Sequence, residues 1–349
     1  MSRIPWRLTE RVAGRAAGRY PLEGTYHMRQ LAQEAPGLMT QAAELAVAET
    51  GLSGFGSPGV EVVTRSEWAS ANVSFFAQIL GPAEETMFRR FGEEGKARRL
   101  ASSVSARLVA VELGTVLGFL ARRVLGQYEL VLPREDRSGD TVLLVGANVL
   151  RLERIHQFRP ADFRLWIALH ESTHRLQFHG IPWLQGYFLG LVHDLVSSSK
   201  PEAGRLGRVV GELRAAAEQG RPLVDESGLF GILASDQQRA LIDKVQALMS
   251  LLEGHGHVVM DRIGSRLIKS HARMARILRM RRNDPRMQAF LRLSGLELKL
   301  RQYELGERFV RGVELLGGWS ALDAAWRGPE FLPSRAEIED PEGWLSRVA

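Results

Sequence analysis

The stretch from Phe163 to Phe178 constrains this chain most, because it places two histidines and a glutamate at fixed positions on one predicted helix. His170 and His174 are four residues apart, so at about 3.6 residues per turn their imidazoles lie one above the other on the same face. Glu171 lies beside them, within reach of a water molecule on a metal ion that both rings hold. The HExxH spacing therefore predicts a zinc site, with His170 and His174 as ligands and Glu171 as general base.

The surroundings of this motif favour a true helix. Asp162 follows Pro160 as an N-cap, Trp166 and Ile167 belong to an apolar stripe, and Gly180 ends the element. The alternative is an ordinary helix in which both histidines are satisfied by hydrogen bonds.

A catalytic zinc ion needs a third protein ligand, and the chain has no cysteine, so this ligand must be a nitrogen or an oxygen donor. The long metzincin pattern would place a glycine at position 177 and a histidine at position 180. The chain has Gln177 and Gly180 there, and His179 points off the metal face, so the metzincin interpretation fails.

The favoured third ligand is Glu253, on a segment that reads as a helix from about residue 236 to 264. Glu253, His257 and Asp261 are spaced by four and share one face of this helix. A ligand glutamate followed one turn later by a polar group is typical of gluzincin third-ligand helices. We therefore expect Glu253 to bind the metal.

Other residues stay open at this stage. Asp194 lies at the downstream distance at which short-spaced gluzincins place their ligand, and His257 or His255 are further alternatives for the metal. His257 is also a candidate catalytic residue, because it could orient a ligand or stabilise the oxyanion. His271 and the tyrosines are alternative oxyanion donors.

The hydrophobic patterns indicate an α+β protein that is mainly α, with a small β-sheet next to the HExxH helix. Helices are expected over 36–51, from Ser66 onwards and over 98–126, where Gly114 and Gly118 predict close helix packing, and most of the chain after the HExxH helix is expected to be helical. The expected strands are 60–64, 128–133 and 141–146. An edge strand beside the metal helix could align an extended substrate by strand addition.

The chain of 349 residues divides, by this pattern, into a basic N-terminal leader (1–35), an N-terminal helical part (36–126) and a zincin-like catalytic part (127–349). The last two are expected to pack as one compact unit. No secretory signal and no apolar stretch of about 18 residues is evident, so a membrane span is not expected. Together with the lack of cysteine, this predicts a cytoplasmic protein.

The formal charge of +6 comes almost wholly from arginine. Arginines recur every four residues from Arg3 to Arg19, and others crowd the segment 273–286. These clusters could bind nucleic acid or anionic lipid, but a solvated helix face is the simpler interpretation because no nucleic-acid motif accompanies them.

Several blocks beyond HExxH give the chain a family resemblance. They are Arg65–Trp68 with Ala71–Asn72, Val124–Tyr128, Phe163–Trp166, Gln177–Phe178 with Pro182–Leu184, Leu252–His255 with Val259–Asp261, Leu300–Gly306, Pro329–Pro333 and Pro341–Arg347. With these blocks the chain resembles the zincin-like metallopeptidase type 2 family, a bacterial domain of unknown function that includes a subgroup labelled as associated with deazaflavin coenzyme biosynthesis. The resemblance implies a mostly helical zincin-like fold, a zinc cofactor held by His170 and His174, and Glu253 as the remaining ligand.

These observations together predict a zinc-dependent hydrolase that cleaves a peptide or other amide bond. Two alternatives remain. One is a zinc amidohydrolase of a small molecule, which would have a closed pocket instead of a groove along an edge strand. The other is a non-catalytic binding or scaffold protein that keeps the fold.

Overall fold

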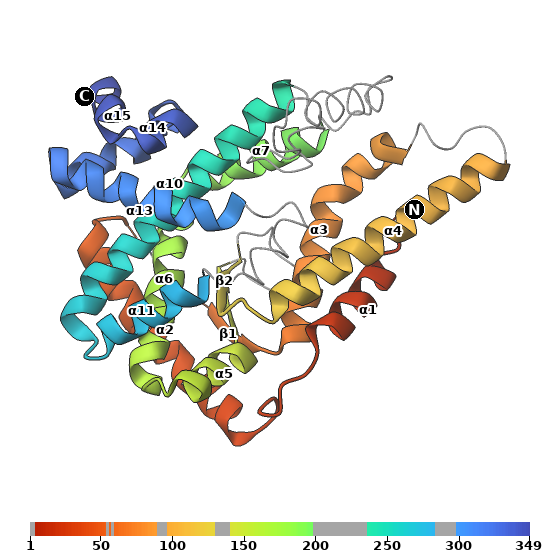
Figure 1. The fold of residues 1–349 in the computed structure, drawn as a ribbon, viewed down its shortest axis with the longest axis horizontal. Coiled ribbons are helices and arrows are strands. Elements are labelled where there is room, and N and C mark those ends of the chain that lie inside the picture. The colour runs from red at the N-terminus through yellow and green to blue at the C-terminus, as the bar shows by residue number, and fades with distance from the viewer. Residues whose placement is uncertain are drawn as a thin grey trace, which may run out of the picture. The chain divides into compact units, whose positions relative to one another are not determined.

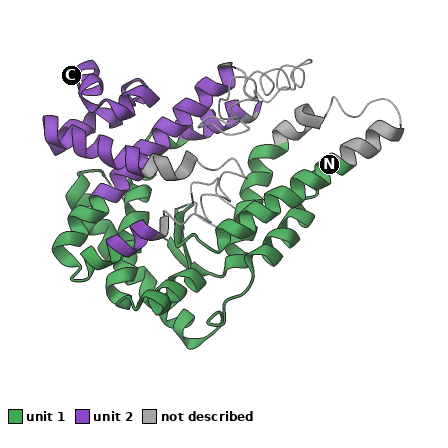
Figure 2. Ribbon diagram, in the orientation of Figure 1, with its two compact units in different colours: residues 1–185, 259–275 green, residues 186–258, 276–349 purple. Residues whose placement is uncertain are grey.

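The structure is a computed structural model that describes residues 4–53, 56, 59–88, 96–129, 140–197, 236–282 and 298–349. The chain forms two compact units (Figures 1 and 2). Unit 1 comprises residues 1–185 and 259–275, and unit 2 comprises residues 186–258 and 276–349. Each unit is thus built from segments that are separate in the sequence.

Unit 1 contains a three-stranded sheet with the order β1-β3-β2. The central strand β3 (Thr141–Val145) pairs in parallel with β1 (Gly59–Val63) and antiparallel with β2 (Gly126–Tyr128). All five residues of β3 are buried, as expected for an apolar strand that is paired on both sides and covered on both faces. The strands expected at 60–64 and 141–146 are confirmed, whereas residues 130–133 of the third lie outside the described residues.

One face of unit 1 is formed by α1 (Trp6–Ala17), α3 (Arg65–Phe88) and α4 (Lys96–Ala121), which lie side by side in Figure 1. Helix α1 packs on α4 at two glycines. A Cβ at Gly114 would lie 2.6 Å from the carbonyl oxygen of Thr9, and one at Gly118 would lie 2.5 Å from that of Ala13. The close packing predicted for these glycines is therefore confirmed.

Helix α4 is shorter at its C-terminal end than the segment 98–126 suggested. It ends at Ala121, and the backbone then turns, so that Gly126 is the first residue of β2. The N–H of Val145 binds the carbonyl oxygen of Leu125 at 2.9 Å, so pairing with β3 takes the backbone groups that a longer helix would have used.

A second helical group in unit 1 consists of α2 (Tyr26–Thr50), α5 (Gly146–His156) and α6 (Pro160–Gly180). Helix α2 begins ten residues before the predicted start at 36 and carries Pro36 in its interior. Proline lacks an N–H and therefore costs a hydrogen bond. Burial of Leu31, Ala35, Met39 and Ala46 on one face outweighs this cost.

Unit 1 also includes residues 259–275, which form the end of α10 (Asp236–Leu267) and the start of α11 (His271–Arg282). The guanidinium groups of Arg262 and Arg266 both bind the carboxylate of Glu49 on α2. The hydroxyl of Ser270 donates to Asp162 at 2.6 Å, and the backbone N–H of Ser270 donates to the same oxygen at 3.2 Å. These contacts bind the late segment to α2 and α6.

Unit 2 contains most of α7 (Leu184–Ser197) and α10, together with α13 (Leu298–Gly317), the 3-10 segments η2 (Trp319–Trp326) and η3 (Pro329–Phe331), α14 (Arg335–Glu339) and α15 (Pro341–Val348). Its core includes Leu251 on α10, Phe309 on α13 and Trp344 on α15. The α10 and α13 backbones meet directly, because a Cβ at Gly254 would overlap Gly306.

The predicted fold class is confirmed: the protein is mainly α-helical and has one small mixed sheet, with β2 against the HExxH helix α6. The three-part division of the sequence stays a prediction. Within the described residues, no helix has an apolar stretch long enough to span a membrane.

Candidate metal centre

Helix α6 carries the HExxH residues, and its sequence explains where it begins and ends. Arg159 is the N-cap, and Pro160 occupies the first helical position, where the missing N–H costs nothing. Asp162, which was expected as the N-cap, instead supplies a negative charge in the first turn. At the other end, a Cβ on Gly180 would lie 2.6 Å from the carbonyl oxygen of Ser53, and Ile181 is extended. Between these ends, buried residues pack α6 on α2.

The imidazoles of His170 and His174 face each other on α6. Their Nε2 atoms are 3.2 Å apart, and the ring centroids are 4.5 Å apart with the planes at 80°. Both side chains are partly buried. The two nitrogens therefore point to one common place beside the helix.

Gln177, one turn after His174, fixes the orientation of that histidine. Its Oε1 lies 2.8 Å from His174 Nδ1, and the glutamine is fully buried. A carbonyl oxygen can only accept, so Nδ1 carries the proton and donates to Gln177. In a neutral imidazole this leaves a lone pair on Nε2, which is the atom that faces His170.

This arrangement fits a tetrahedral zinc ion. With Zn–N distances of about 2.0–2.1 Å, two nitrogens on one ion are about 3.3 Å apart. The Nε2 atoms of His170 and His174 are already at 3.2 Å. An acceptor on the second nitrogen of a ligand histidine, here Gln177, is the usual support of such a site.

Glu253, the expected third ligand, is a buried carboxylate on α10. It belongs to unit 2, whereas His170 and His174 belong to unit 1, and its role as a metal ligand stays a prediction. Two imidazoles and a carboxylate match the donor set of catalytic zinc sites.

Glu171 is a buried carboxylate that lies against the backbone of strand β2. Only 5% of the residue is exposed. A Cβ added to Gly126 would lie 2.5 Å from Glu171 Oε1, so the carboxylate occupies the space next to this glycine. The expected general base is thus confined between α6 and β2.

Next to His174, a buried arginine fastens α6 to the sheet. Arg175 is 1% exposed and binds both carboxylate oxygens of Asp140, at 2.7 and 2.6 Å. Asp140 directly precedes β3 and also contacts Tyr128. Burial, together with Asp140, raises the pKa of Tyr128 to about 12, so its hydroxyl stays protonated at neutral pH.

The predicted alternatives to Glu253 lie in different surroundings. Asp194 is on an exposed face of α7. His255 is buried, with the rings of Trp319 and Trp326 at centroid distances of 5.7 and 5.3 Å, which explains its burial by aromatic packing.

His257, the other proposed catalytic residue, lies one turn after Glu253 on α10. Its Nε2 is 3.3 Å from the carboxylate of Glu307, which belongs to the same unit 2. His271 lies 3.1 Å from Asp261. The roles of His257 and His271 stay predictions.

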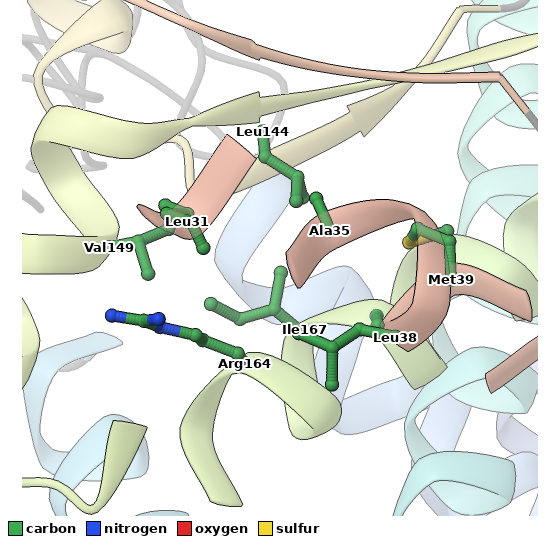
Figure 3. Close-up of a pocket in the computed structure, with 9 residues that line it drawn as sticks. Leu31, Ala35, Leu38, Met39, Leu144, Val149, Arg164 and Ile167 are labelled. Atoms are coloured by element: carbon green, nitrogen blue, oxygen red, sulfur yellow. The ribbon is translucent and has the colours of Figure 1, made fainter. Parts of the chain in front are cut away.

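A small cavity in unit 1 lies away from the HExxH side chains. Apolar side chains of α2 and α6 line it together with Arg164 (Figure 3). Its volume of about 10 Å³ is room for a single water at most. Arg164 donates two hydrogen bonds to Glu153 and one to Glu34, so it serves as a structural ion pair.

Comparison with known proteins decides the family. The sequence profile of the zincin-like metallopeptidase family matches residues 4–345, which is nearly the whole chain. The chain belongs to this family. The resemblance of the sequence blocks, and the zincin-like fold expected from it, are thereby confirmed.

A solved structure is also similar to this zincin-like protein over its full length. It is a protein from Chloroflexus aurantiacus described as "a putative hydrolase with a novel fold", with 29% sequence identity and a TM-score of 0.71. The match covers 99% of this chain and 98% of that one. A search of curated proteins found no match. Family and neighbour both indicate a hydrolase, and membership of a zincin-like family implies a metal, for which the described residues include candidate groups.

Sequence reasoning assigned no role to three residues that support this zincin-like site: Gln177, Arg175 and Gly126. Helical spacing was a usable signal for Gln177, which is three residues from His174 and thus on a neighbouring position of the helix surface. Arg175 and Gly126 gave no such signal, since their partners are 35 and 45 residues away in the sequence.

Proposed function

We propose that this protein is a zinc-dependent metallopeptidase in which His170, His174 and Glu253 hold the ion and Glu171 is the general base. One observation carries the proposal: the Nε2 atoms of the two histidines converge at 3.2 Å, with His174 oriented by Gln177. The same distance would also suit a hydrogen bond between the two rings, and membership of a zincin-like family favours a shared metal ion over that alternative.

A zinc ion bound at these residues supplies Lewis-acid chemistry, which lowers the pKa of a water molecule and polarises a carbonyl group. Glu171 accepts the proton of the attacking water and then donates it to the leaving amine. Glu171 follows His170 directly on α6, and its carboxylate is buried against Gly126. His257 is the proposed partner for the developing oxyanion.

A peptide is the favoured substrate because of strand β2. This strand pairs with β3 on one side, and within the described residues no strand pairs with its other side. Glu171 lies against the first residue of β2. An extended peptide added to this edge would therefore pass the general base. The cytoplasmic location, and the absence of a nucleic-acid function, stay predictions.

The first test separates enzyme from scaffold. Zinc-loaded wild-type protein is incubated with a peptide library and compared with Glu171→Gln, which keeps the shape of the side chain, and with Glu44→Gln on an exposed face of α2. Loss of the base is expected to reduce cleavage by about 10²–10⁴-fold, whereas Glu44→Gln cleaves like the wild type. Equal absence of cleavage in all three proteins would support a non-catalytic scaffold, and equal cleavage would show that Glu171 is not the general base. Cleavage of short N-acyl amides but of no peptide would support an amidohydrolase.

The second test concerns the third ligand. Elemental analysis of purified protein is expected to give one zinc ion per chain for the wild type and for Asp194→Asn, and much less for Glu253→Ala. The reverse pattern would make Asp194 the ligand. Full zinc occupancy in both variants would mean that neither of these carboxylates is a metal ligand.

A further inference from the structure

Strand β2 turns one of its faces toward helix α6. Gly126 and Tyr128 are two residues apart, so in a strand they point to the same face. The ring of Tyr128 stacks on Phe178 of α6, with centroids 6.5 Å apart and planes at 20°. Gly126 therefore also faces α6, where it meets Glu171.

The positions along α6 agree with this arrangement. Glu171, Arg175 and Phe178 follow one another at spacings of four and three, which places them on one side of the helix. Arg175 is held by Asp140 at the start of β3, and Phe178 is covered by Tyr128. Two contacts, besides the one between Glu171 and Gly126, therefore hold α6 against the sheet.

Strand β2 cannot recede from Glu171. Gly126 is paired with Leu144 of the buried strand β3, and the Leu125 carbonyl accepts a hydrogen bond from β3. On the opposite face of β2, the amide of Gln127 pairs with the amide of Asn72, with both N···O distances at 3.3 Å. A side chain at position 126 would therefore displace the Glu171 carboxylate and leave the strand in place.

The size of that displacement follows from the contact. A Cβ on Gly126 would lie 2.5 Å from Oε1 and 2.7 Å from both Cδ and Cγ of Glu171, which is well inside van der Waals contact. The carboxylate is the movable end of a flexible side chain, so it would shift by about 1 Å. A shift of this size is enough to disturb proton transfer, which requires hydrogen-bond distance.

We propose that Gly126 is a positioning residue for the Glu171 carboxylate, and that the site requires a residue without a side chain at this place in β2. The inference rests on the proposed function, because it assigns a role to the space around the general base. It adds that the sheet, and not the metal helix alone, determines where the base lies.

The experiment uses Gly126→Ala in the zinc-loaded full-length chain, with a peptide that the wild type cleaves. The expected result is a kcat reduced by about 10²-fold, with KM and zinc affinity unchanged. Gly59→Ala in β1 is the matched control, because its Cβ would be crowded at 3.0 Å by Thr141 Oγ1 in the same sheet, away from Glu171. This control is expected to keep the wild-type kcat.

A double-mutant cycle gives a readout that is independent of activity. Gly126→Ala is expected to lower Tm by about 2 °C in the wild type and by less than half of this in Glu171→Ala, where the methyl group has room. Equal Tm shifts in both backgrounds, or a wild-type kcat in Gly126→Ala, would overturn the inference alone. A wild type as inactive as Glu171→Gln would overturn the proposed function, and the inference with it.

Discussion

Replacing Gln177 by leucine tests the metal centre through a residue that touches neither metal nor substrate. Leucine keeps most of the side-chain volume of glutamine and removes the oxygen to which His174 Nδ1 donates at 2.8 Å. Gln177 is fully buried, so water cannot take its place. His174 would then lose the group that fixes its tautomer and its ring orientation.

The expected magnitude follows from this geometry. Loss of an outer partner of a ligand histidine reduces metal affinity by about 10–100-fold, which corresponds to about 1.4–2.7 kcal/mol. Because the hydrogen bond is buried and has no substitute, Gln177→Leu should fall in the upper part of this range. Gln177→Glu keeps an acceptor and makes the imidazole more basic, so this variant should bind zinc at least as well as the wild type.

The assay is competition for zinc with a fluorescent chelator at pH 7. Gln246→Leu is the matched control, since it removes a buried amide oxygen that accepts from Arg335 at 2.6 Å in unit 2. The control should bind zinc like the wild type. Zinc affinity that is unchanged in Gln177→Leu, or equally reduced in Gln246→Leu, would refute the reasoning.

Three further predictions concern stability. Arg164→Met leaves the buried Glu153 carboxylate without its bidentate partner and should lower the free energy of unfolding by about 3–5 kcal/mol in urea titration. Hydrogen bonds from Arg347 lower the pKa of Glu337 from 4.5 to about 2, so the stability that this pair contributes is complete above pH 4.5 and is lost as the pH falls to 2. The difference in free energy of unfolding between wild type and Glu337→Gln should therefore shrink to zero over that range. Gly306→Ala would force a methyl group against the backbone of α10 and should lower the urea midpoint, by about 1–3 kcal/mol in stability.

Local spacing was sufficient to predict helix α6 and the convergence of its histidines. The positions of His170 and His174 depend only on the turn of one helix. The predicted N-cap, Asp162, was wrong, because the helix already begins at Pro160 with Arg159 as its N-cap. The strands β1 and β3 were predictable for a similar reason, because each is a short run of β-branched or apolar residues. These features need no knowledge of the rest of the fold.

Features that depend on distant partners were harder to predict. Pro36 suggested a helix start, but the buried face of α2 extends ten residues further back. No proline or glycine interrupts the sequence between Ala121 and Gly126, yet the backbone leaves the helix there because β3 is available for pairing. Local propensity is outweighed by packing in both cases.

The candidate site also combines residues that local spacing predicts with residues whose role depends on distant partners. Helical spacing placed Glu253 on a suitable helix face and favoured it over Asp194, but it left Asp194 open, since a ligand far along the sequence from His170 is not fixed by local spacing. Gly126 is the clearest case. From the sequence it is interpreted as the end of a helix, and its contact with Glu171 is visible only in the folded structure.

The discontinuous make-up of unit 1 has a consequence for protein synthesis. Arg262 and Arg266 bind Glu49 across more than 200 residues of sequence, and residues 259–275 belong to the unit although residue 185 completes its first segment. At about 5–20 residues per second, a ribosome needs roughly 5–18 s to add the 90 residues between positions 185 and 275. Throughout that interval the nascent chain exposes the surface of α2 and α6 that residues 259–275 cover in the folded unit. Cotranslational folding of unit 1 is therefore completed only when this segment, made long after residues 1–185, packs onto α2 and α6.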